Sequence, residues 1–221
     1  HFLERSTLKS ISPQSGPTDG NTQVIIRGKP FHDSSPIHCK FGRTSTRATF
    51  INSTAIMCIV PKSDSTAAAV AVRVSLNGKD FSGASLLRFQ YYAQPTITHM
   101  RPRQGQAFHT NLITLTGVGY FPSLPMRCRL AASDGLSATS AAPTVYLSPT
   151  EIQCALPASI GPRSSAVEIA MNGQNFVKSF SMFNSYSVCK IDDISPKLGP
   201  ESGGTAVLIY GDRFQNVDSL R

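Results

Sequence analysis

Five cysteines are the residues whose spacing points most clearly to chemistry. Cys39 and Cys58 have 18 residues between them, Cys128 and Cys154 have 25, and Cys189 stands apart. We interpret the first four as two disulfides, Cys39–Cys58 and Cys128–Cys154, although four cysteines allow three connectivities and buried free thiols are the alternative. Disulfides persist in oxidising compartments and seldom in the cytosol. Cys189 would either stay free or pair with a cysteine outside this chain.

The other reactive side chains form no catalytic pattern. None of the histidines has the spacing of a zinc site, and the acidic residues are too sparse to argue for a pair of catalytic carboxylates. The glycines of Gly117–Phe121 lack the helix and the Lys-Ser/Thr pair of a phosphate loop. We therefore expect no enzyme activity, no cofactor and no metal site. The histidines are His1, His32, His38, His99 and His109.

One Asn-x-Ser/Thr sequon is present, at Asn52. It lies between the first two cysteines, near the expected end of a strand. In a secreted protein it predicts glycosylation of Asn52, and otherwise it is a chance tripeptide.

The composition is that of a folded, mildly basic protein. The 221 residues are 40% hydrophobic and 15% charged, which disfavours disorder, and the net charge is +8. Residues 1–93 carry 11 Lys/Arg against 5 Asp/Glu, a surplus of +6. That surplus could attract nucleic acid, anionic glycans or acidic lipid, but the basic residues are scattered singly, which favours a soluble basic surface. No run of 18 apolar residues occurs, and the first residues lack Met and a signal core, so we expect an excised fragment whose membrane contact, if any, lies elsewhere.

The segments that carry these residues are predicted to be strands. Residues 69–78 alternate, with Val70, Val72, Val74 and Leu76 on one face, which is typical of a half-buried strand. An Asn-Gly pair follows and predicts a hairpin turn into residues 86–92.

The same succession of segments recurs along the chain. Residues 11–31 and 194–214 share eleven of 21 positions, and residues 111–117 and 166–186 repeat the strands of the first unit. We predict two complete units, at 8–93 and 95–188, and the beginning of a third at 190–221. Gly28 in the first unit and Gly211 in the third end the apolar strand that follows the Gly- and Pro-rich turn. A Phe follows each of them three residues later, where it could cap one end of the core. The residues 131–143, small and polar, are read as an insertion in the second unit.

These segments resemble IPT/TIG domains, the immunoglobulin-like fold shared by plexins, related receptors and some transcription factors. The resemblance rests on "ISPQSGPTDGNTQVIIRG", "CKFG", "TAIMCIVP", "VRVSLNGKDFS" and "FQYY" in the first unit, with "MRPRQG", "CRL", "TEIQCALP", "EIAMNGQNF" and "FNSY" in the second. It implies an all-β chain of tandem immunoglobulin-like sandwiches arranged end to end. The fold leaves function open.

The leading hypothesis is an extracellular binding or adhesion segment of a cell-surface protein in the plasma membrane, or a semi-rigid receptor stalk. Its partner would be a protein ligand or an identical chain on a facing cell, with an anionic glycan as a further candidate. The alternatives are a nucleic-acid-binding module of a transcription factor and an accessory module of a secreted polysaccharide-active enzyme. The cysteine pairs and the sequon argue against nucleic acid as the partner.

Overall fold

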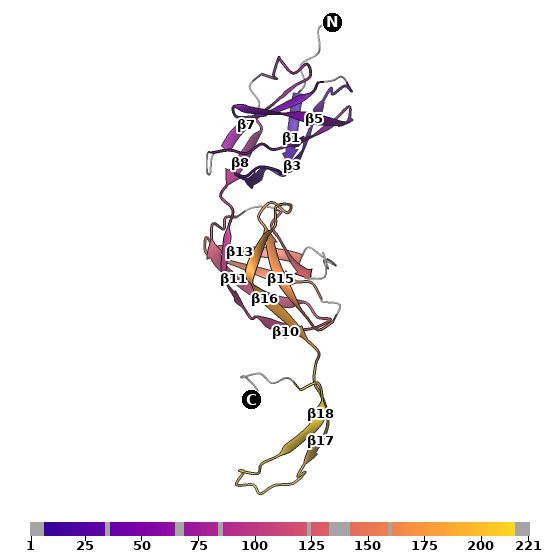
Figure 1. Cartoon of the computed structure of the whole chain (residues 1–221), viewed down its shortest axis with the longest axis vertical. Coiled ribbons are helices and arrows are strands. Elements are labelled where there is room, and N and C mark those ends of the chain that lie inside the picture. Colours follow the sequence, from indigo (N-terminus) through magenta and orange to yellow (C-terminus); the bar gives the residue numbers. More distant parts are fainter. Residues whose placement is uncertain are drawn as a thin grey trace.

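The chain is built from β-strands. The computed structural model describes residues 7–33, 36–64, 69–83, 86–122, 125–132, 142–158 and 161–214, and these ranges contain strands but no helix. The prediction of an all-β fold is confirmed. Two sandwich units lie in line and a separate hairpin lies beyond them, so the described chain is elongated (Figure 1).

The first unit contains eight strands in one continuous sheet that folds over itself. Their order is β1-β3-β6-β5-β4-β7-β8-β2, and neighbours are antiparallel except for the parallel pair β2 and β8. The strands are β1 (Thr7–Ser12), β2 (Ser15–Pro17), β3 (Gln23–Lys29), β4 (His38–Phe41), β5 (Thr44–Asn52), β6 (Ala55–Ile59), β7 (Ala69–Ser75) and β8 (Arg88–Tyr92).

The second unit repeats this topology strand for strand. Its order is β9-β11-β14-β13-β12-β15-β16-β10, again with a single parallel pair, β10 and β16. The two units are therefore copies of one fold, as the repeated sequence predicts. The strands are β9 (Thr96–Arg101), β10 (Gln104–Gln106), β11 (Asn111–Val118), β12 (Arg127–Ala132), β13 (Ala142–Ser148), β14 (Glu151–Leu156), β15 (Arg163–Ala170) and β16 (Val177–Tyr186).

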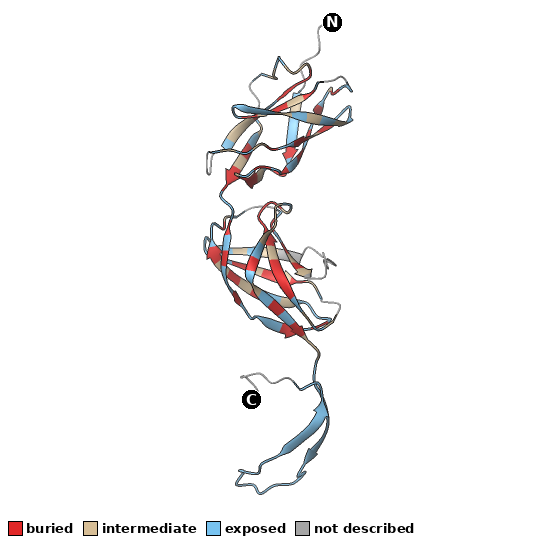
Figure 2. Ribbon diagram, in the orientation of Figure 1, coloured by how far each residue is buried: buried red, intermediate tan, exposed pale blue. Residues whose placement is uncertain are grey.

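Each unit has its own hydrophobic core between the two layers (Figure 2). Alternation sets which residues enter it, since successive side chains of a strand point to opposite faces. In β3, Val24, Ile26 and Gly28 are buried while the residues between them face outward. Val72 and Val74 of β7 are buried as the alternating pattern predicts.

A glycine at the end of the second long strand lets an aromatic ring close one end of each core. A Cβ on Gly28 would lie 3.1 Å from the Phe31 ring, and one on Gly117 would lie 2.9 Å from the Tyr120 ring. Phe31 and Tyr120 are both buried. The ring crosses the backbone where a side chain would otherwise stand, so the glycine and the aromatic residue work as a pair.

One disulfide lies in each core. Cys39 of β4 is joined to Cys58 of β6 with their Cα atoms 6.4 Å apart, and Cys128 of β12 is joined to Cys154 of β14 with Cα atoms 6.1 Å apart. In each unit the bonded strands are the two neighbours of one middle strand, β5 or β13, at which the sheet passes from one layer to the other. The bond therefore ties the two layers together across that corner. Cys189 is unpaired and exposed.

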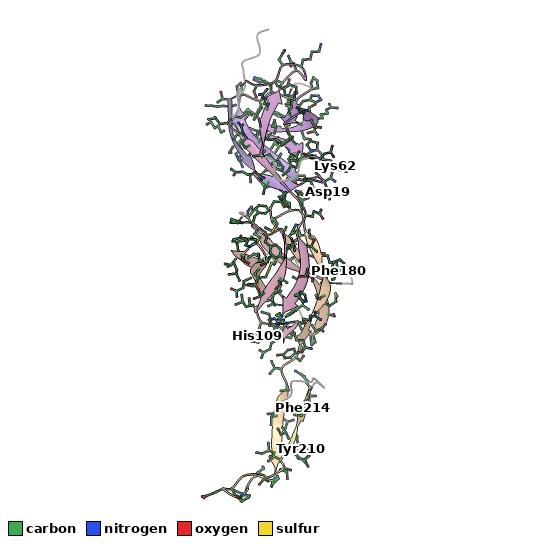
Figure 3. The ribbon with its side chains drawn as sticks, turned by 90° about the vertical axis from the view of Figure 1, so that its left-hand side faces the viewer. Asp19, Lys62, His109, Phe180, Tyr210 and Phe214 are labelled. Atoms are coloured by element: carbon green, nitrogen blue, oxygen red, sulfur yellow. A yellow bond between two sulfur atoms is a disulfide. The ribbon has the colours of Figure 1, made fainter. Side chains whose placement is uncertain are left out.

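Residues 190–214 form a hairpin that repeats the opening of the first unit. β17 (Lys190–Ser195) pairs with β18 (Leu208–Asp212), and Ile194 faces Ile209 as Ile11 faces Ile26 in the first unit. The exposed fraction of Ile194 is 41% against 3% for Ile11, so the face that forms core in the first unit is open to solvent here. Tyr210 and Phe214 lie on this hairpin (Figure 3).

The boundaries 8–93, 95–188 and 190–221 stay a prediction at the level of single residues. Apart from Thr7, the first residue of β1, the strands of the two sandwiches fall within the first two ranges, and the hairpin falls within the third. Most of the insertion predicted at 131–143 lies outside the described residues.

We predict that removing the first disulfide weakens the fold. The variant Cys39→Ala/Cys58→Ala should lose about 3 kcal/mol of unfolding free energy, because the bond restricts the unfolded chain. Urea unfolding followed by circular dichroism measures the loss. The matched control, Cys189→Ala, should leave stability unchanged because that thiol is exposed. Four alkylatable thiols at Cys39, Cys58, Cys128 and Cys154 in the unreduced protein would contradict the pairing.

Candidate functional site

The residues predicted to carry chemistry do not meet in one place. Asn52 ends β5 on the surface, and its Oδ1 accepts hydrogen bonds of 2.9 Å from both the backbone N–H and the hydroxyl of Thr54. Its glycosylation stays a prediction. Within the described ranges, no three His, Cys, Asp or Glu side chains lie close enough together to hold a metal ion. No described helix is long and apolar enough to cross a membrane.

The two units contact each other at a junction to which both contribute side chains. The junction begins with two adjacent tyrosines. Only residues 93–95 separate β8 from β9. Tyr91 is 1% exposed and belongs to the core of the first unit, whereas Tyr92 is 6% exposed and belongs to the core of the second. Adjacent side chains of a strand point to opposite sides, and here the two sides are two different units.

Tyr92 anchors the end of β8 in the second unit. Its ring lies 5.1 Å from that of Phe121, centroid to centroid, and its backbone carbonyl accepts a hydrogen bond of 2.9 Å from the N–H of Thr18. The residue is thus held by its backbone in the first unit and by its side chain in the second. A three-residue linker with such an anchor allows little independent motion of the units.

A turn of the second unit makes the polar half of the junction. We call residues 172–175, which connect β15 to β16, the Asn172 turn. The Oδ1 of Asn172 accepts hydrogen bonds from the N–H groups of Gln174 (3.1 Å) and Asn175 (2.9 Å), and Gly173 supplies a φ of 74°. The side chain of Asn172 therefore satisfies the turn's own backbone before the turn meets the first unit.

The Asn172 turn binds the start of β2, the start of β3 and Thr22 of the first unit through three residues. Asn172 Nδ2 donates to the carbonyl of Ser15 (3.0 Å), and the hydroxyl of Thr22 donates to Asn175 Oδ1 (2.8 Å). Gln174 Nε2 donates to the backbone carbonyl of Gln23 (3.0 Å), and the N–H of Gln23 donates to Gln174 Oε1 (3.2 Å). Asn172 and Thr22 are 1% and 0% exposed, so their part of the network is shielded from water, whereas the bonds of Gln174 are exposed. In the shielded part, hydrogen bonds are stronger and unpaired groups are costly.

The first unit carries the same turn at its other end. Asn77 Oδ1 accepts from the N–H groups of Lys79 (3.0 Å) and Asp80 (2.8 Å), and Asn77 Nδ2 donates to Asp80 Oδ2 (2.8 Å). Lys79 and Asp80 are exposed, whereas their counterparts Gln174 and Asn175 contact the other unit. Charged residues thus occupy the solvated copy, and neutral amides occupy the copy that forms the junction.

Beside the Asn172 turn lies a cleft of about 370 Å³ between the units. The first unit contributes Ser12 and Pro13 to its walls, and the second contributes Arg127, Arg129 and Phe176 among others. Asp19 and Lys62 also lie at this end of the first unit (Figure 3) but do not line the cleft.

The two arginines of the cleft differ in their partners. Arg129 binds Glu168, its cross-strand neighbour, through Nε and Nη2 at 2.7 Å each, and its guanidinium lies 3.8 Å from the centroid of the Phe176 ring. Arg127 is exposed, and no carboxylate in the described part of the chain pairs with it. Sequence reasoning missed this site. The signal present in the sequence was that the charged pair Lys79-Asp80 in the first copy of the turn corresponds to the neutral pair Gln174-Asn175 in the second.

We predict that Asn172→Ala loosens the junction. The change removes the donor to Ser15 and leaves two turn N–H groups without their acceptor, which should cost about 1–3 kcal/mol of unfolding free energy. Small-angle X-ray scattering should show a broader distribution of particle lengths. Asn77→Ala is the matched control, because it breaks the equivalent turn of the first unit away from the junction. Equal scattering of the two variants would contradict the role of the Asn172 turn.

We predict that stability falls at alkaline pH. Burial raises the pKa of Tyr91 and of Tyr120 to about 12. It also raises the pKa of Tyr92. The folded state keeps these phenols neutral while the unfolded chain ionises near pH 10, so their contribution is present below pH 10 and is lost between about pH 10 and 12. Among the residues that the structure describes, the hydroxyls of Tyr92 and Tyr120 have no hydrogen-bond partner.

Urea unfolding at a series of pH values tests this. Tyr92→Phe/Tyr120→Phe should unfold at the same or a higher urea concentration at pH 7, since no hydrogen bond is lost. It should also show a shallower decline above pH 10. A decline as steep as that of the unchanged protein would refute the assignment.

Comparison with known proteins now identifies the fold. Residues 6–91 match the family model of the IPT/TIG domain. Human fibrocystin-L is 26% identical over 219 residues, which is 98% of this chain and 5% of that protein. The probable serine/threonine-protein kinase drkC of Dictyostelium discoideum is 41% identical over 54 residues, 24% of this chain and 7% of that protein. The chain thus spans a small fraction of these relatives.

A solved structure of the full extracellular region of plexin A4 superposes with a TM-score of 0.59 at 20% identity, over 89% of this chain and 18% of that one. This likeness concerns the fold. Together with the family match, it confirms the immunoglobulin-like sandwich predicted from the repeated segments. The family match covers residues 6–91, and the chain continues into a second unit with the same strand order.

Proposed function

We propose that this chain is an extracellular binding or adhesion segment of a multi-domain cell-surface protein. The observation that carries the proposal is the junction, where Tyr92 and the Asn172 turn hold two disulfide-bonded sandwiches in line. A segment built in this way keeps its length and direction. It can hold a recognition surface away from a membrane, or act as a semi-rigid receptor stalk.

Three features support an extracellular location. Both complete units contain a buried cysteine pair, a chemistry suited to oxidising compartments. The sequon at Asn52 is exposed and so open to glycosylation. The fold is also that of the extracellular region of plexin A4. Under this proposal the chain divides at 8–93, 95–188 and 190–221, and residues 190–214 are the opening hairpin of a third unit.

The partner under this proposal is a protein ligand or an identical chain on a facing cell. The first unit has the larger basic surplus, so an anionic glycan is a second class to test. The chain acts by contact and does no chemistry of its own.

The location is tested on the full-length protein in intact cells. A membrane-impermeant biotin reagent should label it, and an asparagine-specific glycosidase should lower its mass, with Asn52→Gln removing the shift of this segment. A cytosolic protein serves as the control for leakage. Protein that is labelled only after lysis, with reduced cysteines and a salt-sensitive DNA shift, would replace this proposal with the transcription-factor alternative.

Recognition is tested with beads coated with the purified segment. Clustering of coated beads would identify an identical chain as the partner, and binding of dispersed beads to cells would identify a different surface ligand. Beads coated with reduced and alkylated protein are the control. If the beads neither cluster nor bind cells, the recognition role is wrong and only the role of a receptor stalk remains.

A further inference from the structure

We propose that the cleft at the junction binds a single carboxylate, from an Asp or Glu side chain on a loop of a protein partner. The inference rests on the proposed binding function and names its site and its chemistry. Four cleft residues carry the argument: Ser12 from the first unit, and Arg127, Arg129 and Phe176 from the second.

The charge of the cleft comes from Arg127. No acidic residue lines the cleft among the described residues, and the charge of Arg129 is balanced by Glu168 at 2.7 Å. Arg127 therefore supplies one positive charge without a protein counterion. A guanidinium presents parallel N–H groups that match the two oxygens of a carboxylate, which makes the pair geometrically specific.

The walls of the cleft are held before any partner arrives. Arg129 is fixed between Glu168 and the ring of Phe176, whose centroid lies 3.8 Å from its guanidinium. Gly173, with a φ of 74°, brings the Asn172 turn against Pro125 and the stem of Arg127, and a Cβ there would lie 2.9 Å from the Pro125 carbonyl. A preorganised wall lowers the entropy lost on binding.

The opposite wall belongs to the other unit. Ser12 at the end of β1 is an exposed residue that lines the cleft, and its hydroxyl makes no hydrogen bond to any described residue. A hydroxyl and a guanidinium are both donors, and a carboxylate is an acceptor of several hydrogen bonds. The site therefore exists only while the two units are docked.

A single unpaired cation in a small, open cleft favours a single carboxylate over a polyanion. A volume of about 370 Å³ lies at the small end of ligand sites and accommodates one side chain with its flanking backbone. Linear polyanions gain affinity from many cations along an open track. The cleft offers one such charge, so a sulfated glycan would leave most of its sulfates without partners here.

The test is a titration of the isotopically labelled two-unit chain, followed by two-dimensional NMR. The probe is the capped tripeptide acetyl-Gly-Asp-Gly-amide, and acetyl-Gly-Asn-Gly-amide is its neutral twin. We expect saturable shifts of cleft resonances with a weak Kd, on the order of 1 mM, for the Asp peptide. The Asn peptide should bind at least about tenfold more weakly, and added salt should weaken the Asp peptide.

Arg127→Gln should weaken the Asp peptide about tenfold with an unchanged circular dichroism spectrum. Arg73→Gln, an exposed arginine of β7 in the first unit, is the matched control and should bind as the unchanged chain does. Equal binding of the Asp and Asn peptides, or full binding by Arg127→Gln, would overturn the proposal. So would a sulfated tetrasaccharide that binds the cleft more tightly than the Asp peptide.

These outcomes are separable from those that test the extracellular function. A failed titration would leave labelling on intact cells and bead binding as they stand. A cytosolic location would remove the extracellular function while the affinity of the cleft for a carboxylate remained measurable.

Discussion

The arrangement of this protein depends on a buried hydrogen-bond network centred on Asn172. One amide side chain closes its own turn through Oδ1 and reaches the Ser15 carbonyl of the other unit through Nδ2. Because Asn172 is 1% exposed, an arrangement that left its amide unpaired would be costly, which favours one mutual orientation of the two units over others. The cleft beside it and the in-line shape of the segment both follow from that orientation.

The two units show how one fold serves two environments. Their strand orders are identical, and each closes its core with a glycine and an aromatic ring and ties its layers with a disulfide. They differ where they meet solvent or each other. The turn at Lys79 and Asp80 is charged and solvated, whereas the turn at Gln174 and Asn175 is neutral and docked. The same turn thus carries charged side chains where it faces solvent and neutral amides where it contacts the other unit.

Much of the fold of each unit could be predicted from the sequence, because strands and turns leave local patterns of residue types. The alternation at Val72 and Val74 places β7, and the occurrence of one cysteine pair in each unit anticipates the bonds that join β4 to β6 and β12 to β14. The junction could not be predicted in this way. Asn77 and Asn172 sit in nearly the same local sequence, and only the neighbour across space distinguishes them. Arg127 likewise gains its significance from Ser12, more than a hundred residues away in the chain.

The central claim is that the two sandwiches form one rigid body. Residual dipolar couplings of backbone amides measure it most directly, because each unit reports its own alignment in a weakly ordered medium. The account predicts one alignment tensor that fits the couplings of both units with the same magnitude and orientation. Two tensors of clearly different magnitude would show that the units move independently, and would contradict it.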